Sequence, residues 1–216
     1  MSDFAQEVAE LVAPHLPPGS RPALAAELGR FCALLREANE HLNLTRITDA
    51  RGMALLHVVD ALTVLPLLRD VHSLVDLGSG GGVPGVPLAL ARPDLRVTLL
   101  ESRGRKSEAL AGIVEALGLH RRVGVLPERG EVWLKTHKVD AVVARAVGRA
   151  PEVLTLLSPV RKGFGRLILM KGPSVDAELT ELNPRWVGAL GFGLPKRLDT
   201  ALPDGERRVL LQFRVR

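Results

Sequence analysis

An acidic residue and a cluster of glycines lie close together at residues 74–85. The apolar run 74–77 contains Asp76 and leads into the segment 78–85, in which five of eight residues are glycine. Glycine has no Cβ, so a glycine-rich turn lets the backbone approach a ligand closely. The Asp76 carboxylate would lie beside that turn, where it suits a ligand with ammonium or sulfonium groups better than a pyrophosphate. The spacing therefore predicts a binding site for a partly cationic small molecule.

A second acid follows the next apolar run. Glu101 comes directly after the residues 97–100, and it lies 23 residues after Gly78. An acid at the end of a second strand can accept hydrogen bonds from both hydroxyls of a ribose. NAD-dependent proteins use the same arrangement, so Glu101 predicts a nucleoside without choosing the cofactor. The alternative is a surface acid that caps the following helix.

Two other nucleotide-binding loops fit the glycine turn less well. A P-loop requires Gly-Lys followed by Ser or Thr, and the turn has no such continuation. Gly80, Gly82 and Gly85 satisfy the dinucleotide pattern G-x-G-x-x-G, but prolines would then lie at the start of the helix that receives the pyrophosphate. Counted from Gly78, that pattern fails at Val83. The pattern D-x-G-x-G-x-G is instead that of enzymes that use S-adenosylmethionine (AdoMet), which we predict as the cofactor.

Short β-rich runs alternate with helical stretches on both sides of this turn. We predict strands at 74–77, 97–100, 123–126, 141–143 and 167–170, with helices at 85–91, 105–117 and 150–158. Such alternation is typical of right-handed βαβ units on a parallel sheet. A last pair of strands is predicted at 186–192 and 207–215, joined across the turn at 203–205. The pattern predicts an α/β fold in which the glycine turn lies at the carboxyl edge of the sheet, where ligands bind.

The first 70 residues have a helical texture instead. Apolar residues recur with a helical period at 4–12, from about Pro22 to His41, and from a cap at Thr48 or Asp49 to Leu68. We therefore predict a helical N-terminal extension, residues 1–70, packed on a main domain of residues 71–216.

Composition narrows the class of protein. The 216 residues carry a net charge of +5, which fits a polyanionic partner and fits solubility alone equally well. The single Cys32 cannot form an internal disulfide and gives no spacing for metal ligands, so we predict no metal site and a reducing compartment. We find no leader and no uninterrupted run of about 18 apolar residues. We expect a soluble, cytoplasmic protein with no membrane contact.

Basic residues open the predicted helix after Glu101. Positive charge at a helix N-terminus is unfavourable to the helix dipole, which favours a role for Arg103, Arg105 and Lys106 in contacting RNA phosphates over a solvated helix face. The arginines near the C-terminus fit an exposed edge strand and an RNA-binding patch equally well; they are Arg207, Arg208, Arg214 and Arg216.

Several motifs together resemble one family. They are Leu42-Asn43-Leu44-Thr45, His57 with Asp60, the turn 78–85, Glu101-Ser102, and Arg105-Lys106. From about residue 30 to 213 the chain closely resembles the RsmG/GidB family of bacterial 16S rRNA guanine-N7 methyltransferases. The resemblance implies a Rossmann-like class I AdoMet-dependent methyltransferase with a seven-stranded, mostly parallel sheet. It also implies a guanine in a conserved loop of the small-subunit rRNA as substrate.

The resemblance assigns roles by position. Gly78 and Val83 would contact AdoMet from the turn, Gly130 and Glu131 would contact its adenine, and Arg145 would lie beside the methyl donor. With the residues found above, the predicted cofactor-binding set is Asp76, Gly78, Gly80, Val83, Glu101, Gly130, Glu131 and Arg145. The chain departs from the family's usual residues at Ala61, Ala144 and Val147, which affects base placement rather than the cofactor motif.

The predicted chemistry needs few residues. Guanine N7 carries a lone pair and no proton, so its methylation requires no general base. Catalysis would depend on alignment, and we predict Arg145 and Lys171 as positioning residues that hold O6 or phosphate. For His57 and Asp60 we favour a hydrogen bond that fixes the N-terminal helices over a catalytic role.

Two other functions stay open from the sequence. The chain could be an AdoMet-dependent methyltransferase that acts on a protein or a small molecule, or a non-catalytic RNA-binding relative. Retention of both acids and the glycines speaks against the second. With the small ribosomal subunit as partner we expect a monomer, and the sequence does not tell whether naked rRNA, an assembly intermediate or the mature subunit is methylated.

Overall fold

Alternating apolar residues bury the central strands on both faces. The computed structural model describes residues 2–216. On β1 (Ser73–Leu77) Leu74 packs into one hydrophobic cluster, whereas Val75 and Leu77 pack into the other. On β4 (Val139–Arg145) Ala141 and Val142 divide in the same way. A period of two with both sides apolar is the pattern of a parallel strand covered by helices on each face.

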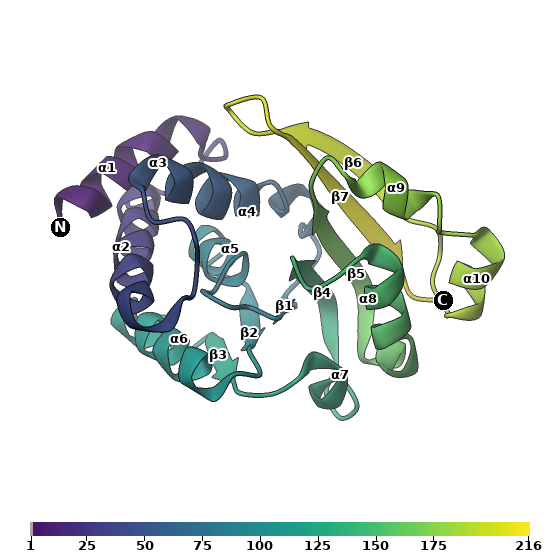
Figure 1. Cartoon of the computed structure of the whole chain (residues 1–216). Coiled ribbons are helices and arrows are strands. Elements are labelled where there is room, and N and C mark those ends of the chain that lie inside the picture. The colour runs from purple at the N-terminus through teal and green to yellow at the C-terminus, as the bar shows by residue number, and fades with distance from the viewer. Residues whose placement is uncertain (1) are drawn as a thin grey trace.

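Within residues 2–216, seven strands form one sheet in the order β3-β2-β1-β4-β5-β7-β6 (Figure 1). The remaining strands are β2 (Arg96–Leu100), β3 (Val123–Leu126), β5 (Phe164–Lys171), β6 (Lys196–Ala201) and β7 (Arg207–Arg214). The first five strands are parallel, and β7 runs antiparallel to both β5 and β6. This arrangement confirms the predicted α/β, Rossmann-like fold.

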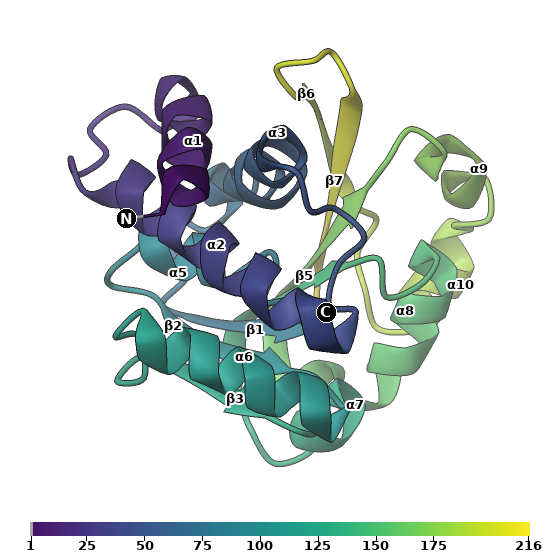
Figure 2. The ribbon, with the colours of Figure 1, turned by 60° about the vertical axis from the view of Figure 1, so that its left-hand side comes forward.

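Helices cover both faces of the sheet. One face carries α1 (Asp3–Val12), α2 (Leu24–Leu42), α5 (Gly85–Ala91) and α6 (Gly104–Ala116). The other carries α7 (Gly130–Trp133), α8 (Ala150–Leu157), α9 (Val175–Leu179) and α10 (Pro184–Ala189). Figure 2 shows α1 crossing α2, and α2 lying along α6.

The N-terminal helices share the core of the main domain. A single cluster of buried side chains extends from Val8 on α1 through Phe31 on α2 to Leu210 on β7. The predicted extension therefore packs on the sheet without a separate hydrophobic core among the described residues.

The third predicted helix has an unusual centre. It consists of α3 (Ala50–Gly52), a π-helical segment (Met53–Val59) and α4 (Asp60–Leu62). Asp49 caps it, as predicted, by accepting a hydrogen bond from the backbone of Gly52. It ends at Leu62 rather than Leu68, and a short 3-10 turn (Leu65–Leu67) follows. The stretch Ala50–Leu67 is long and apolar enough to cross a membrane by composition, but 67% of it is buried inside the protein, as in a core helix.

One predicted strand is wrong. The sequence pattern predicts that residues 186–192 pair with 207–215, but α10 occupies Pro184–Ala189, and β7 pairs with β5 and β6. Only an isolated antiparallel bridge joins Phe192 to Val215. The side chain of Asn183 accepts hydrogen bonds from the backbone amides of Arg185 and Trp186, which starts a helix. The predicted turn at 203–205 does join the two last strands.

Candidate active site

The glycine turn lies where the order of the sheet reverses. β1 is followed in the chain by β2 on one side and is paired with β4 on the other. Such a switch point opens a crevice beyond the carboxyl ends of the strands. Gly78, Gly80 and Gly82 have φ angles of 70°, 53° and 85°, which residues with a Cβ rarely adopt. The amides of Gly78 and Ser79 both donate to the carbonyl of Leu100, at 2.9 and 3.0 Å, and fix the turn against β2.

Both predicted acids hold the turn in place. Oδ2 of Asp76 accepts a hydrogen bond from the amide of Gly85 at 2.8 Å, at the start of α5. The two oxygens of Glu101 accept from the amides of Gly80 (3.1 Å) and Arg103 (2.9 Å). The geometry gives both acids a structural role in the turn, and a direct contact with the cofactor stays a prediction for each.

Asp76 is the more deeply buried of the two acids, with 1% of its surface exposed. Burial raises the pKa of its carboxyl to about 7, because desolvation disfavours the charged form more than the hydrogen bond from Gly85 and the charge of Arg145 favour it. At neutral pH a large fraction of this carboxyl is therefore protonated.

Two small cavities flank Gly78. The first, which we call the Gly130 cavity, has a volume of about 200 Å³ and is lined by Leu77, Gly78, Leu100, Ser102, Glu128, Arg129, Gly130, Glu131, Val147 and Leu156. The second, the central cavity, has about 190 Å³ and is lined by Leu35, Leu44, Thr45, His57, Gly78, Ser79, Gly80, Gly81, Val83, Arg145 and Ala146. Five predicted cofactor-binding residues besides Arg145 therefore line one or both cavities; they are Gly78, Gly80, Val83, Gly130 and Glu131.

Gly130 packs tightly against a leucine side chain at the Gly130 cavity. A Cβ at Gly130 would lie 2.0 Å from Cδ1 of Leu77, in a buried position at the start of α7. Glu131 is partly exposed, and its carboxylate lies 3.6 Å from the guanidinium of Arg129. The lining combines the apolar side chains of Leu77, Leu100, Val147 and Leu156 with polar groups, a mixture that suits a planar ring with polar edges.

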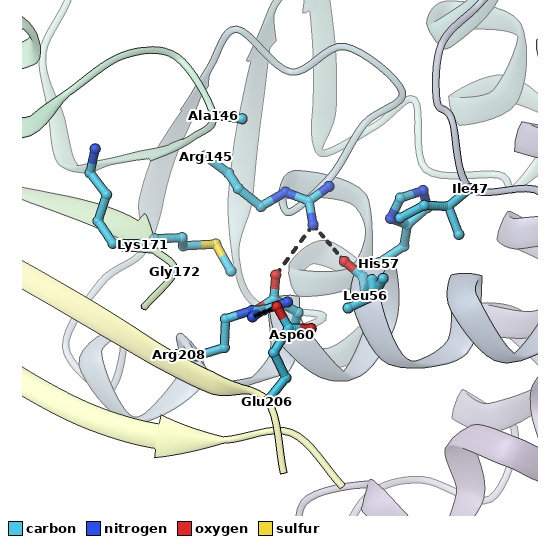
Figure 3. Close-up of a pocket in the computed structure, with 11 residues that line it drawn as sticks. Ile47, Leu56, His57, Asp60, Arg145, Ala146, Lys171, Gly172, Glu206 and Arg208 are labelled. Atoms are coloured by element: carbon cyan, nitrogen blue, oxygen red, sulfur yellow. Dashed lines mark hydrogen bonds and ion pairs between the residues drawn. The ribbon is translucent and has the colours of Figure 1, made fainter. Parts of the chain in front are cut away.

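A third and larger cavity adjoins the central one. This Asp60 cavity has about 440 Å³, and it shares His57, Arg145 and Ala146 with the central cavity. Its remaining lining residues are Ile47, Leu56, Asp60, Met170, Lys171, Gly172, Glu206 and Arg208 (Figure 3). Sequence reasoning missed Glu206, and it left Arg208 open between an edge strand and an RNA-binding patch, because only the insertion of β7 beside β5 brings both to this edge of the sheet.

Asp60 lies between two arginines in this cavity. Its Oδ2 is 3.3 Å from Nη1 of Arg145, which also donates to the carbonyl of Leu56 at 2.5 Å. Its Oδ1 accepts from Nε of Arg208 at 3.1 Å. Burial raises the pKa of Asp60, and the two guanidinium groups oppose that rise. The hydrogen bonds join α4 to β4 and β7.

His57 lies one turn before Asp60 and is neutral. Burial, with the nearby charge of Arg145, lowers its pKa to about 4. Its Nε2 is 2.8 Å from the hydroxyl of Thr45, in the loop that follows α2. The predicted fixing of the N-terminal segments by His57 and Asp60 fits these contacts, although both side chains also line the cavity.

The other predicted basic residues differ in whether their side chains are bonded within the protein or exposed. Nζ of Lys171 donates to the carbonyl of Gly148 at 2.6 Å and pairs with Glu178 at 2.8 Å, so Lys171 is largely engaged within the protein. Lys106 donates to the carbonyl of Asn43 at 2.9 Å and joins α6 to the loop after α2. Arg103 and Arg105 are exposed. Over residues 2–216, no group of three or more metal-ligating side chains lies together.

Comparisons with known proteins identify the family of this chain. The family described as "GidB: rRNA small subunit methyltransferase G" matches residues 24–189. A protein named ribosomal RNA small subunit methyltransferase G from Solibacter usitatus is 40% identical over 178 residues, covering 82% of this chain and 83% of that protein. One of the same name from Sorangium cellulosum is 44% identical over 171 residues, covering 76% and 70%.

Solved structures share the fold at low identity. The METTL16 methyltransferase domain has a TM-score of 0.63 at 15% identity, covering 99% of this chain and 92% of that one. TrmK of M. capricolum, solved with S-adenosyl-homocysteine, has a TM-score of 0.57 at 14% identity, covering 72% and 67%. The residues that the family matches include most of the sheet and all lining residues of the three cavities except Glu206 and Arg208. Because the match covers more than half of the chain, the chain belongs to the GidB family of rRNA small subunit methyltransferases.

Proposed function

We propose that this protein transfers a methyl group from AdoMet to N7 of a guanine in 16S rRNA of the small ribosomal subunit. The observation that supports it most directly is the set of three cavities that share lining residues at the carboxyl edge of the sheet. The two on either side of Gly78 fit a nucleoside and an amino-acid chain, and the third lies next to them across Arg145.

The chain's own residues fit AdoMet. The backbone at Gly78 and Gly80 has the positive φ angles of a tight glycine turn, and Gly130 lines the neighbouring cavity together with Leu77. We assign the adenine to the Gly130 cavity and the methionine part to the central cavity. When bound there, AdoMet supplies an electrophilic methyl group.

The residues of the Asp60 cavity suit an acceptor that needs no deprotonation. Guanine N7 already presents a lone pair, and the neutral His57 and the doubly paired Asp60 are not required as bases. Arg145 commits one Nη to Leu56 and Asp60, which leaves its other nitrogens to donate to O6 or to a phosphate. Its role is to orient the base, because a donor placed on N7 itself would block the reaction.

We further propose that the protein acts as a cytoplasmic monomer without a metal ion or a membrane. The exposed Arg103 and Arg105 beside the cofactor turn would contact rRNA phosphates, whereas Lys106 acts mainly within the fold. Light scattering of the purified protein, alone and with rRNA, tests the monomer.

Methyl transfer from labelled AdoMet tests the function. Purified protein is incubated with small subunits and with extracted 16S rRNA, and the modified base is mapped. We expect label on one guanine N7. Label on another base or on protein would contradict the proposal, and so would an absence of AdoMet binding by calorimetry at tens of micromolar.

The Arg145→Gln variant adds a residue-level check. Hydrogen bonds to charged groups contribute about 1.5–3 kcal/mol, so we expect kcat/KM for rRNA to fall about 10- to 100-fold. An unchanged kcat/KM would remove Arg145 from the proposed machinery.

A further inference from the structure

Arg208 brings a second guanidinium to the Asp60 cavity from β7. Its side chain is 13% exposed, and it lies on the side of Asp60 opposite Arg145 (Figure 3). Nε donates to Asp60 at 3.1 Å, and Nη1 pairs with Glu206 at 2.6 Å. The two arginines come from strands that are separated in the sheet only by β5.

Donors remain uncommitted on both arginines. Within residues 2–216, no hydrogen bond engages Nη2 of Arg208, or Nε and Nη2 of Arg145. The cavity is lined by the cationic side chains of Arg145, Lys171 and Arg208 and by the carboxylates of Asp60 and Glu206. Because Glu178 already neutralises Lys171, the free donors of the cavity are those of the two arginines. An excess of donors and positive charge beside an open cavity favours a ligand that presents acceptor oxygens.

A purely structural role explains this arrangement less well. A buried carboxylate needs one well-placed guanidinium, and each further buried charge adds a desolvation cost. Here Asp60, 4% exposed, orients two guanidinium groups at once, one through each oxygen. Such a carboxylate limits the rotamers of both arginines and holds their remaining donors in the cavity.

We propose that Arg208 binds an acceptor oxygen of the target nucleotide, either O6 of the guanine or a neighbouring phosphate, and that Asp60 is the positioning residue for Arg208 and Arg145. This inference rests on the proposed function, because it takes the Asp60 cavity as the site of the substrate nucleotide. Arg208 lies outside the residues 24–189 that the family matches, so the assignment comes from the geometry of this chain.

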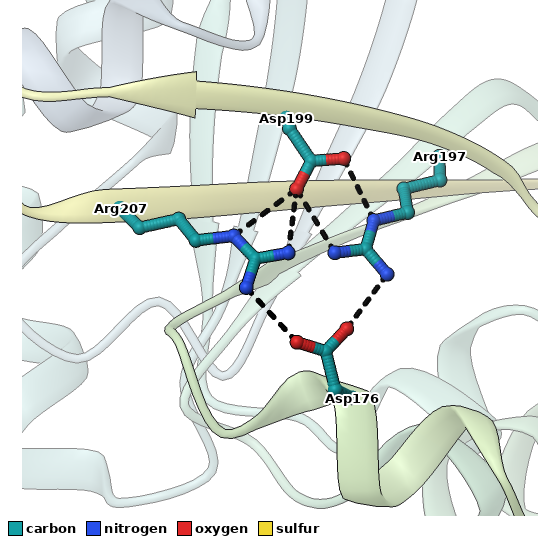
Figure 4. A network of polar contacts seen from close by, with 4 residues as sticks. All are labelled: Asp176, Arg197, Asp199 and Arg207. Carbon is teal, nitrogen blue, oxygen red and sulfur yellow. Dashed lines mark hydrogen bonds and ion pairs between the residues drawn. The ribbon is translucent and has the colours of Figure 1, made fainter.

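The test compares Arg208→Gln with a matched control on the same strand. Arg207 also pairs with two carboxylates, Asp176 and Asp199, but that cluster lies outside the cavity, against α9 (Figure 4). For both variants we would measure the Kd for extracted 16S rRNA, the KM and kcat of methyl transfer, and the Kd for AdoMet. We expect Arg208→Gln to raise the Kd and KM for rRNA about 10-fold with an unchanged Kd for AdoMet. Arg207→Gln should change none of these four quantities.

Salt dependence separates the two sources of the oxygen. If Arg208 contacts a phosphate, the slope of log Kd against log salt concentration falls by about 1 in Arg208→Gln. If it contacts O6, affinity falls with the slope unchanged.

Three outcomes would overturn the inference. The first is Arg208→Gln with the same rRNA affinity as Arg207→Gln. The second is a loss of AdoMet binding as large as the loss of rRNA binding, which would indicate a structural role. If Arg208→Gln does not fold, Arg208→Met keeps the length of the side chain without its donors or charge, and wild-type rRNA affinity of that variant is the third. Because rRNA affinity is measured without methyl transfer, failure of the wild type to methylate guanine N7 contradicts only the proposed function.

Discussion

Two buried polar atoms near the glycine turn lack a hydrogen-bond partner within the part of the chain that the structure describes. They are Nδ1 of His57 and Oδ1 of Asp76. A buried charged oxygen without a partner is costly, whereas a protonated carboxyl avoids most of that cost. The raised pKa of Asp76 expresses this balance: the fold tolerates the group best in its neutral form.

The pH dependence of stability should reveal this state. Because burial raises the pKa of Asp76 from its usual value near 4 to about 7, the folded protein binds more protons than the unfolded chain in that range. The contribution of Asp76 to the free energy of unfolding is therefore fully present below pH 4 and decreases as the pH rises toward 7.

The Asp76→Asn variant removes that dependence. Asparagine is neutral at every pH, and its oxygen can still accept the hydrogen bond from the amide of Gly85. We expect the free energy of unfolding of the variant, minus that of the wild type, to increase by about 1–3 kcal/mol from pH 5 to pH 8. Urea denaturation at both pH values measures this. A difference between the two proteins that does not change with pH would contradict it.

Helices α1 and α2 depend on one glycine for their close contact. A Cβ at Gly29 would lie 2.1 Å from the backbone oxygen of Ala5, which cannot move without moving α1. We expect Gly29→Ala to lower the free energy of unfolding by about 1–3 kcal/mol, as overpacking in a core does. Urea denaturation again provides the measurement.

A second glycine in a helix supplies the control. Gly112 on α6 is exposed, and a Cβ there meets nothing within 4 Å. Replacement by alanine should therefore raise the free energy of unfolding by about 0.8–1.0 kcal/mol through helix propensity alone. If the Gly29→Ala variant also had a higher free energy of unfolding than the wild type, the packing argument for α1 and α2 would be wrong.

Local patterns predicted the elements that carry strong periodic signals. The buried strands β1, β2 and β5 read as apolar runs, and the glycine turn located the carboxyl edge of the sheet. The edge strand β6 escaped prediction because four of its six residues are charged or polar and none is buried, and only pairing with β7 defines it. At 183–189 the sequence contains two conflicting signals. Asn183-Pro184 is a typical helix start, whereas the apolar Trp186 and Val187 favour a strand, and the structure has the helix.

The parts of the site that the sequence missed come from the topology of the whole sheet. Residues on β1, β2 and the turn are close in sequence, so their motif identified the cofactor region directly. Arg208 approaches Asp60 across 148 positions of sequence, because β7 inserts beside β5. Arg145, at the end of β4, approaches it across 85. Pairs at such separations have no local signal in a single chain.

The distribution of charge over the molecule also became clear only in three dimensions. The chain has a net charge of +5, but several arginines are paired within the fold. The cluster of Arg197, Arg207, Asp176 and Asp199 joins the β6–β7 hairpin to α9 and is neutral as a unit (Figure 4). Arg103 and Arg105 are exposed beside the cofactor turn, and no ion pair engages them within residues 2–216.

The salt dependence of rRNA binding tests this distribution. Each phosphate contact contributes about 0.7–0.9 to the slope of log affinity against log salt concentration. We expect the double variant Arg103→Gln with Arg105→Gln to reduce the magnitude of that slope by about 1.4–1.8, measured by equilibrium binding to extracted 16S rRNA. Arg197→Gln is the matched control, because its guanidinium is already occupied by Asp176 and Asp199, and it should leave the slope unchanged. Equal slopes for the double variant and the wild type would show that the cofactor edge of the sheet does not face the phosphates, and an effect of Arg197→Gln would move the RNA-binding surface to the β6–β7 hairpin.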